Sequence, residues 1–336
     1  METILLLAHT ETDGSLARPA LEALAAAKNL GGELHVGLVG AQVQSAADQV
    51  AGAGAARILA VTGEPFAPSR YSTDAAAAEA LCRASGAAIV LAPGTSRWSR
   101  ALPGAAFRLG GRVDTHATSF AIQNGVPAVT RWFYRQRMEA VLTRSQRPWM
   151  VLLDPGCVPA WSGPAGSVAV ETVDVPAVES RTTVMGTRSP ETGEQTIRPD
   201  AKLLFVAGAG WTKKQPDGAT HTAEAEKLIL HFLRATQASL GGSKSLVDLS
   251  GEGEAVLRFM THLNQIGQTG ATPRHPKGIS TCCHGEEPHA VGWRFIGQRR
   301  AVNLDANCGW ARGKADVLYV ADAFEVMRQV NGLLEA

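Results

Sequence analysis

The residues best suited to chemistry stand in one short segment, residues 265–270, which reads Gln-Ile-Gly-Gln-Thr-Gly. Two glycines there flank an amide and a hydroxyl, so donors and acceptors are dense in a small loop. A flavin ring needs both kinds of group along N5 and its pyrimidine edge, and such a loop suits it. An ordinary surface turn is the alternative, because Gly, Gln and Thr are common loop residues.

Other short segments could hold an anion where a strand ends. Glycines at 206–210 (Val-Ala-Gly-Ala-Gly) would let backbone N–H groups approach a phosphate, although the third glycine of a dinucleotide fingerprint is missing. A tight turn is an equal alternative there. The Gly-Ile-Ser sequence at 278–280 is a candidate pyrophosphate seat, and the turn at 92–97 could also hold an anion.

Gly242-Ser243-Lys244 offers a hydroxyl and a cation just before an expected strand at 245–249. A cation beside a flavin would favour its anionic reduced form. An exposed loop lysine is the competing interpretation.

A thiol or metal site is a further hypothesis, because Cys282, Cys283, His284, His289 and Cys308 could form a soft N/S site. Adjacent cysteines rarely ligate one zinc well, and the sequence has no C-x-x-C pair. We therefore expect these thiols to pack or to line a cofactor pocket.

The composition is that of a globular protein. The chain has 336 residues, 45% of them hydrophobic, with 32 Lys+Arg against 31 Asp+Glu. Without a basic stripe a nucleic-acid partner is not expected, and five cysteines without framework spacing suit a reducing compartment. The apolar start is too short for a signal peptide, and no segment reaches the ~18 apolar residues of a membrane span. We expect a cytoplasmic protein that is not membrane-embedded.

The order of strands and helices predicts an α/β protein of two domains, each with a mainly parallel sheet flanked by helices. The first domain is expected over residues 1–155, with a β-rich addition at 112–153. A linker rich in Pro, Gly, Ser and Thr follows at 156–200, with one exposed-edge strand of alternating valines at 168–175. The second domain, a doubly wound fold that the family resemblance given below implies to be flavin-binding, is expected over 201–336.

The expected strands and helices place most of the candidate binding segments near strand ends. In the first domain they are strands 4–8, 34–39, 57–61 and 88–92, with helices 15–30, 43–52 and 74–85. In the second they are strands 202–208, 277–280 and 300–304, with helices 222–236, 253–262 and 323–334. Five arginines, Arg131, Arg135, Arg137, Arg144 and Arg147, are expected on a solvated face or in a subunit contact.

Taken in order, these pieces resemble the α (large) subunit of electron-transfer flavoproteins, and the chain is a divergent member by that resemblance. The likeness extends over nearly the whole chain and is least clear at 155–200. The segments that carry it are the strand at 4–8, the turn at 91–95 with Leu102-Pro103, Thr143-Arg144-Ser145, Gly242-Ser243, 265–270, 278–280, Asn303 and Ala321-Asp322. The loop at 265–270 followed closely by Gly-Ile-Ser is its most specific part.

The resemblance implies an FAD in the second domain. It implies that Thr269 bonds flavin N5, that Gln268, Gly267 and Ile266 line the ring and ribityl chain, and that Ser280 holds the pyrophosphate. His289 would approach the pyrimidine carbonyl, and Asn303 and Asp322 would meet the adenosine half. The remaining residues expected at the cofactor by the same resemblance are Gly210, Ser243, Lys244, Gln265 and Gly270.

The chain departs from the family pattern at several of these positions. The family's arginine in its Gly-Gly-Arg-Gly turn falls on Gly210, and its Ser-Arg pair becomes Ser243-Lys244, which replaces a planar guanidinium by a point charge. The lysine after Gln-Thr-Gly becomes Ala271, and about four extra residues precede His289.

The function that the resemblance implies is that of an electron carrier rather than an enzyme with its own substrate. Its partners would be a β subunit in a heterodimer, a flavin-dependent dehydrogenase as donor, and a quinone reductase or another acceptor. The alternatives are a nucleotide-binding structural subunit without a redox role and the Cys/His metal or thiol redox site.

Overall fold

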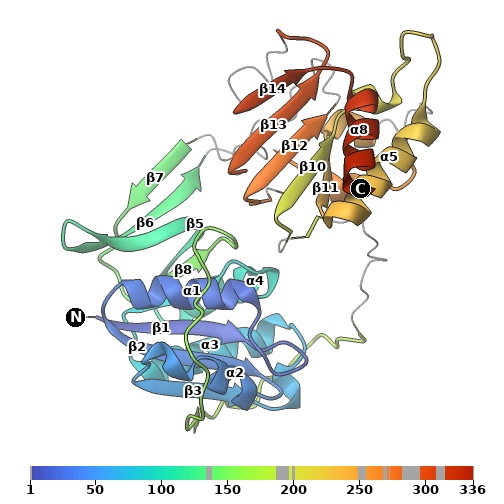
Figure 1. Ribbon diagram of the computed structural model, residues 1–336. Helices are drawn as coiled ribbons and strands as arrows, with labels where there is room; N and C mark the ends of the chain where they lie inside the picture. Colours follow the sequence, from blue (N-terminus) through green and yellow to red (C-terminus); the bar gives the residue numbers. More distant parts are fainter. Residues whose placement is uncertain are drawn as a thin grey trace. The chain divides into compact units, whose positions relative to one another are not determined.

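The computed structural model describes residues 2–133, 138–186, 197–198, 201–248, 255–267, 271, 273–281, 296–307 and 315–335. Internal contacts divide the chain into two compact units, Met1–Thr187 and Arg188–Ala336 (Figure 1). Each unit contains a sheet flanked by helices, so the predicted two-part α/β fold is confirmed. Among the described residues, no helix is long and apolar enough to cross a membrane.

The first unit is built on a nine-stranded sheet of order β7-β6-β5-β8-β4-β1-β2-β3-β9. Strands and helices alternate in its first part: β1 Thr3–His9, α1 Arg18–Asn29, β2 Glu33–Gly40, α2 Gln44–Gln49, η1 Ala51–Ala53, β3 Arg57–Thr62, η2 Glu64–Phe66, α3 Tyr71–Ser85, β4 Ile89–Pro93 and α4 Ser96–Arg108. Ile4 and Leu6 of β1 pack into the core that includes α1, whereas Leu5 and Leu7 pack on the side of α3. Burial on both faces explains why this strand is apolar throughout.

The predicted β-rich segment at 112–153 extends this sheet. Its strands are β5 Arg112–Gln123, β6 Val126–Phe133, β7 Met138–Leu142 and β8 Trp149–Leu153. Strand β8 lies parallel between β4 and β5, whereas β6 and β7 continue the sheet antiparallel.

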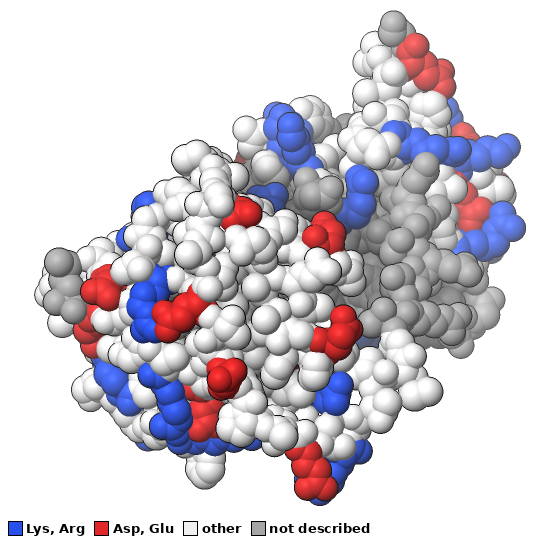
Figure 2. All heavy atoms as spheres, turned by 90° about the horizontal axis from the view of Figure 1, so that it is seen from below, with Lys and Arg blue, Asp and Glu red and all other residues white. Residues whose placement is uncertain are grey.

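On the face drawn in Figure 2, basic and acidic side chains are interspersed, in keeping with a net charge of +1.

One buried carboxylate joins this extension to the parallel strands. Asp114 on β5 is 1% exposed and accepts hydrogen bonds from Arg144 Nε and Nη2 at 2.9 Å, from Arg131 Nη1 at 3.2 Å and from Trp149 Nε1 at 2.9 Å. Burial by itself would raise the pKa of Asp114, but these hydrogen bonds lower it below its usual value. Arg144 is exposed, as expected for a solvated face, whereas Arg131 is only partly exposed. Both guanidinium groups neutralise the buried charge of Asp114.

The alternating valines at 168–175 pack against the first unit. Val168 and Val170 lie against the core on the α1 side, and Val173 and Val175 lie against the core on the α3 side. Between them, β9 (Glu171–Thr172) pairs with the free edge of β3. The division between the units thus falls at 187 and 188, inside the segment predicted to be a linker and later than the predicted boundary at 155.

The second unit has a five-stranded parallel sheet of order β11-β10-β12-β13-β14. Its elements are β10 Leu203–Ala207, η3 Ala209–Thr212, α5 Thr222–Thr236, β11 Ser239–Gly242, α6 Lys244–Asp248, η5 His262–Asn264, β12 Lys277–Thr281, β13 Gln298–Asn303, β14 Val317–Val320 and α8 Ala323–Glu335.

Two sequence expectations in the second unit are wrong. The apolar residues 245–249, expected as a strand, lie largely in helix α6, and the strand precedes them as β11. The helix expected at 253–262 is absent from residues 255–261, and the short η5 follows instead. Short apolar segments fit a buried strand and a buried helix equally well, so their periodicity alone does not separate the two.

Replacing Asp114 by Asn should lower the free energy of unfolding of the first unit by on the order of 3 kcal/mol, because two guanidinium groups lose a buried counter-charge. Urea denaturation of the full chain, followed by far-UV circular dichroism, measures this loss.

The same substitution should matter less in acid. The native pKa of Asp114 is lowered, so its contribution is complete above the unfolded pKa of about 4. That contribution is lost as pH falls through the native pKa. The matched control is Asp316→Asn, which removes an exposed carboxylate bonded to Arg299 and should change stability little. Equal stability of Asp114→Asn and the parent at pH 7 would contradict this account.

Candidate functional site

The strand order of the second unit creates one natural binding edge. From β10 the chain moves to β11 on one side, and then returns to β12 on the other side of β10. In open parallel sheets, ligands bind at the carboxyl ends of the strands where the order reverses in this way. The turns after β10, β11 and β12 therefore outline the candidate site, and they contain residues singled out from the sequence.

The two faces of this sheet differ near that edge. Helices α5, α6 and α8 all contribute to the core on the face of Phe205 and Ala207. On the face of Leu204 and Val206, the described residues contribute no α-helix to the core, and small residues lie in register across the strands. These small residues are Gly241, Gly278, Ser280 and Ala301. A flat group can approach the backbone closely on such a face.

The loop that begins at Gln265 lies over this small-residue face. Ile266 N donates to Gly242 O at 3.1 Å, and a Cβ at Gly241 would come within 2.8 Å of Ile266 Cγ2. Gly267 has a φ of +111°, which favours glycine. Its N–H donates to Ala271 O at 2.8 Å, and Ala271 N donates back to Gln265 O at 2.8 Å, so the loop closes on itself. Gln268, Thr269 and Gly270 lie outside the described residues.

Ser243 lies between β11 and α6, directly before the helix, rather than preceding a strand as expected. Its N–H donates to Ala207 O at 3.0 Å, and its hydroxyl accepts from Leu246 N at 3.2 Å. Lys244 Nζ lies 2.7 Å from Asp248 Oδ2, and the hydrogen bond from Lys244 is the main cause that lowers the pKa of Asp248. The charge of Lys244 is thus compensated within its own helix.

The turn after β10 is locked to the end of β12 by a buried indole. Gly210 and Trp211 lie in η3, and Trp211 is fully buried. Its Nε1 donates to Thr281 Oγ1 at 2.8 Å, and Gly208 N donates to Thr281 O at 2.9 Å. The indole also packs on Phe324 of α8, with ring centroids 4.6 Å apart. Sequence reasoning missed both Trp211 and Thr281, because an apolar residue after a glycine turn gives no chemical signal.

The remaining predicted residues fall at the same edge or outside the described chain. Ser280 is fully buried, and Asn303 points to the same face two residues beyond Ala301. Asp322 begins α8, and its Oδ1 accepts from Glu325 N at 2.9 Å, so it caps this helix. His289 lies outside the described residues. The structure thus brings Gly210, Ser243, Lys244, Gln265, Ile266, Gly267, Ser280, Asn303 and Asp322 to the carboxyl edge of one sheet or to the turns that leave it.

Of two other candidates, the turn at 92–97 receives no support, and the Cys/His cluster lies outside the described residues. At the 92–97 turn, Arg97 is engaged by the buried Asp74 at 2.6 Å and by the carbonyl of Phe66 at 2.6 Å, so it is not available to a ligand. Within the described part of the chain no group of His, Cys, Asp and Glu could hold a metal ion. Cys282, Cys283, His284 and Cys308 lie outside it.

Comparison with known proteins assigns the family. A model of the electron transfer flavoprotein domain matches residues 4–178, more than half of the chain. The chain belongs to the electron transfer flavoprotein family. It is also 24% identical over 333 residues to the electron transfer flavoprotein subunit alpha of Pseudomonas aeruginosa, covering 98% of each chain. The resemblance to the α subunit is therefore confirmed, and with it an electron transfer flavoprotein role.

The family model covers the first unit, whereas the candidate site lies in the second. The alignment with the Pseudomonas aeruginosa protein, in contrast, extends over both units of this chain.

Replacing Trp211 by Phe should destabilise the second unit by about 1–2 kcal/mol, because the hydrogen bond to Thr281 is lost while most of the packing on Phe324 remains. Thermal unfolding of Trp211→Phe, Thr281→Val and the double variant forms a cycle that isolates the bond. If the effects of the two single substitutions simply add, the indole and the hydroxyl are not energetically coupled. That result would contradict a stabilising hydrogen bond between Trp211 and Thr281.

Proposed function

We propose that the second unit binds FAD at the carboxyl edge of its parallel sheet and that the protein carries electrons through this cofactor. The observation that carries the proposal is the convergence at one edge of residues from six separate segments of the sequence. The full-length match to an electron transfer flavoprotein subunit alpha supports the same assignment.

The residues present fit such a cofactor. The register of small residues at Gly241, Gly278 and Ser280 leaves room for a flat ring beside the closed loop at 265–267. The turns that carry Ser243 and Gly210 follow β11 and β10, where backbone N–H groups suit phosphate oxygens. Asn303 ends β13 and Asp322 follows β14, on the side where the adenosine half would lie.

When bound, FAD supplies reversible electron storage, and the chain supplies binding, orientation and electrostatics. On this proposal Gln268 and Thr269 bond the ring, Ile266 and Gly267 support it, Ser280 and the turn after it hold the pyrophosphate, and His289 meets the pyrimidine carbonyl. Gln265 and Gly270 frame the loop. Acid–base catalysis on a substrate is not required.

The proposed partners follow from the family. A β subunit completes a heterodimer, a flavin-dependent dehydrogenase delivers electrons, and a quinone reductase or another acceptor removes them in the cytoplasm. The relative from Pseudomonas aeruginosa is itself a subunit, which supports the heterodimer.

The absorbance spectrum of the purified protein tests the proposal. We expect flavin absorbance bands that bleach reversibly on reduction. Denaturation of the protein should release one FAD per chain. A colourless protein that cannot be reconstituted with FAD would contradict it and favour the structural-subunit alternative. Metal at unit stoichiometry that Cys282→Ser abolishes would favour the metal alternative.

Replacing Gly267 by Ala should weaken FAD binding about tenfold, because a side chain at a φ of +111° strains the loop that supports the ring. Titration of the apoprotein with FAD, followed by quenching of flavin fluorescence, gives the dissociation constant. Gly218→Ala is the matched control, since Gly218 has a φ of +79° in an exposed turn with open space around it. Equal losses in both variants would show that the effect is not specific to this loop.

A further inference from the structure

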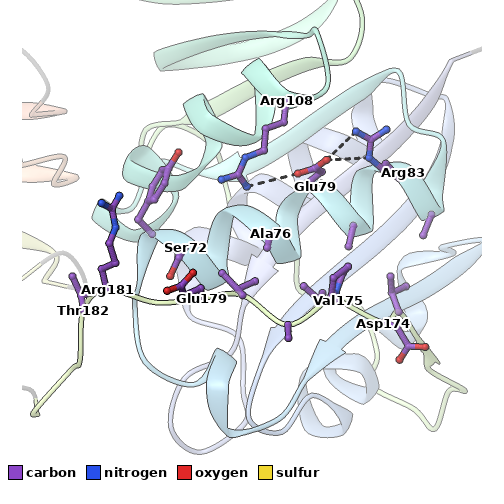
Figure 3. A pocket seen from close by; sticks show the side chains of 17 residues that line it. Ser72, Ala76, Glu79, Arg83, Arg108, Asp174, Val175, Glu179, Arg181 and Thr182 are labelled. Atoms are coloured by element: carbon purple, nitrogen blue, oxygen red, sulfur yellow. Dashed lines mark hydrogen bonds and ion pairs between the residues drawn. The ribbon is translucent and has the colours of Figure 1, made fainter.

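The first unit contains a cavity of about 1060 Å³, and none of its lining residues is among those proposed to bind FAD. It lies between helix α3 and residues 173–182, which we call the strap (Figure 3). A volume of this order accommodates a small organic molecule. All of its lining residues belong to the first unit, so the cavity is separate from the proposed flavin site.

The strap is held at its two ends. At one end Val173 N donates to Ala60 O at 2.8 Å, and Val173 and Val175 pack on the core. At the other end Ser180 Oγ lies 3.4 Å from Ser72 Oγ. Among the described residues, the backbone of 174–182 makes no hydrogen bond to the backbone of another segment. The strap therefore spans α3 without filling the space beneath it.

The floor of the cavity is apolar because of the sequence of α3. Ala76, Ala80 and Ala84 recur every four residues and share one helix face, which is partly exposed. Exposed faces of surface helices ordinarily carry long polar side chains. Val175 and Val178 of the strap also line the cavity. An apolar chain or ring would be covered on both sides.

Cations lie on the helix side of this apolar surface. The Glu79 carboxylate is shared by Arg83 Nη2 at 2.8 Å and Arg108 Nη1 at 3.7 Å, so two guanidinium groups face one carboxylate. The acidic lining residues Asp174 and Glu179 are exposed and belong to the strap, and Figure 3 shows Asp174 directed away from the arginines. Arg181 of the strap balances one of these two carboxylates, so the lining as a whole is neutral. On the helix side alone, two guanidinium groups against the single carboxylate of Glu79 leave a positive charge beside the alanine floor.

We propose that this cavity binds an amphipathic anion, with an apolar chain on the alanine floor and a carboxylate or phosphate head at Arg83 and Arg108. Guanidinium groups suit both heads, because their paired donors match two oxygen atoms.

Isothermal titration of the full-length chain with decanoate, decyl phosphate, decanol and decyltrimethylammonium tests the proposal. We expect both anions to bind with unit stoichiometry, and the tighter one identifies the preferred head. Decanol should bind at least about tenfold more weakly than the tighter anion, and decyltrimethylammonium should not bind. Failure of both anions to bind, or decanol binding as tightly as decanoate, would overturn the proposal.

Two variants separate the head from the floor. Arg108→Gln should weaken decanoate about tenfold but leave decanol unchanged, whereas Ala80→Leu should weaken both by filling the floor. The matched controls are Arg112→Gln, at an exposed position of β5, and Ala25→Leu, at a partly exposed position of α1. Neither residue lines the cavity, so both variants should bind the ligands as the parent does. Unchanged decanoate affinity in Ala80→Leu would place the binding elsewhere. Because FAD plays no part in these titrations, their failure leaves the flavin proposal intact.

Discussion

Parallel strand pairing is the constraint on which both units depend. A parallel pair cannot be closed by a tight hairpin, so each crossover needs a helix or a long connection, and all carboxyl ends then meet at one edge. In the second unit this geometry alone gathers the ends of β10, β11, β12 and β13, which come from distant parts of the sequence. The candidate site follows from the pairing before any side chain is considered.

What the side chains add is an asymmetry between the two faces of that sheet. Phe205 and Ala207 meet three helices, and their face is an ordinary apolar core. On the opposite face, Gly241, Gly278 and Ser280 provide little volume, and the loop at Ile266 rests directly on Gly241. These small residues leave part of this face shallow beside its small apolar core, and on the proposed assignment the flat flavin ring lies there.

The sequence predicted the elements with strong periodicity and failed where short segments were ambiguous. Helix Thr222–Thr236 was expected at its observed bounds because its apolar stripe is long and regular. Residues 245–249 were assigned to a strand, although the buried Leu246 and Val247 serve a short helix equally well. The strand order places Ser243 beside Ala207. Local sequence patterns do not predict this order, because long-range contacts determine it.

Residues that act through buried hydrogen bonds were equally hidden. By the resemblance, Trp211 stands where the family turn has a glycine, and its indole N–H donates to the Thr281 hydroxyl. By the resemblance, the arginine before it has become Gly210, and the second cation, Lys244, is compensated by Asp248 at 2.7 Å. The first change removes a positive charge from the proposed ring environment, and the second keeps a positive charge that Asp248 compensates. A less positive environment stabilises the anionic reduced form less, so on the proposed assignment this chain should hold its flavin at a lower potential than relatives that keep both arginines.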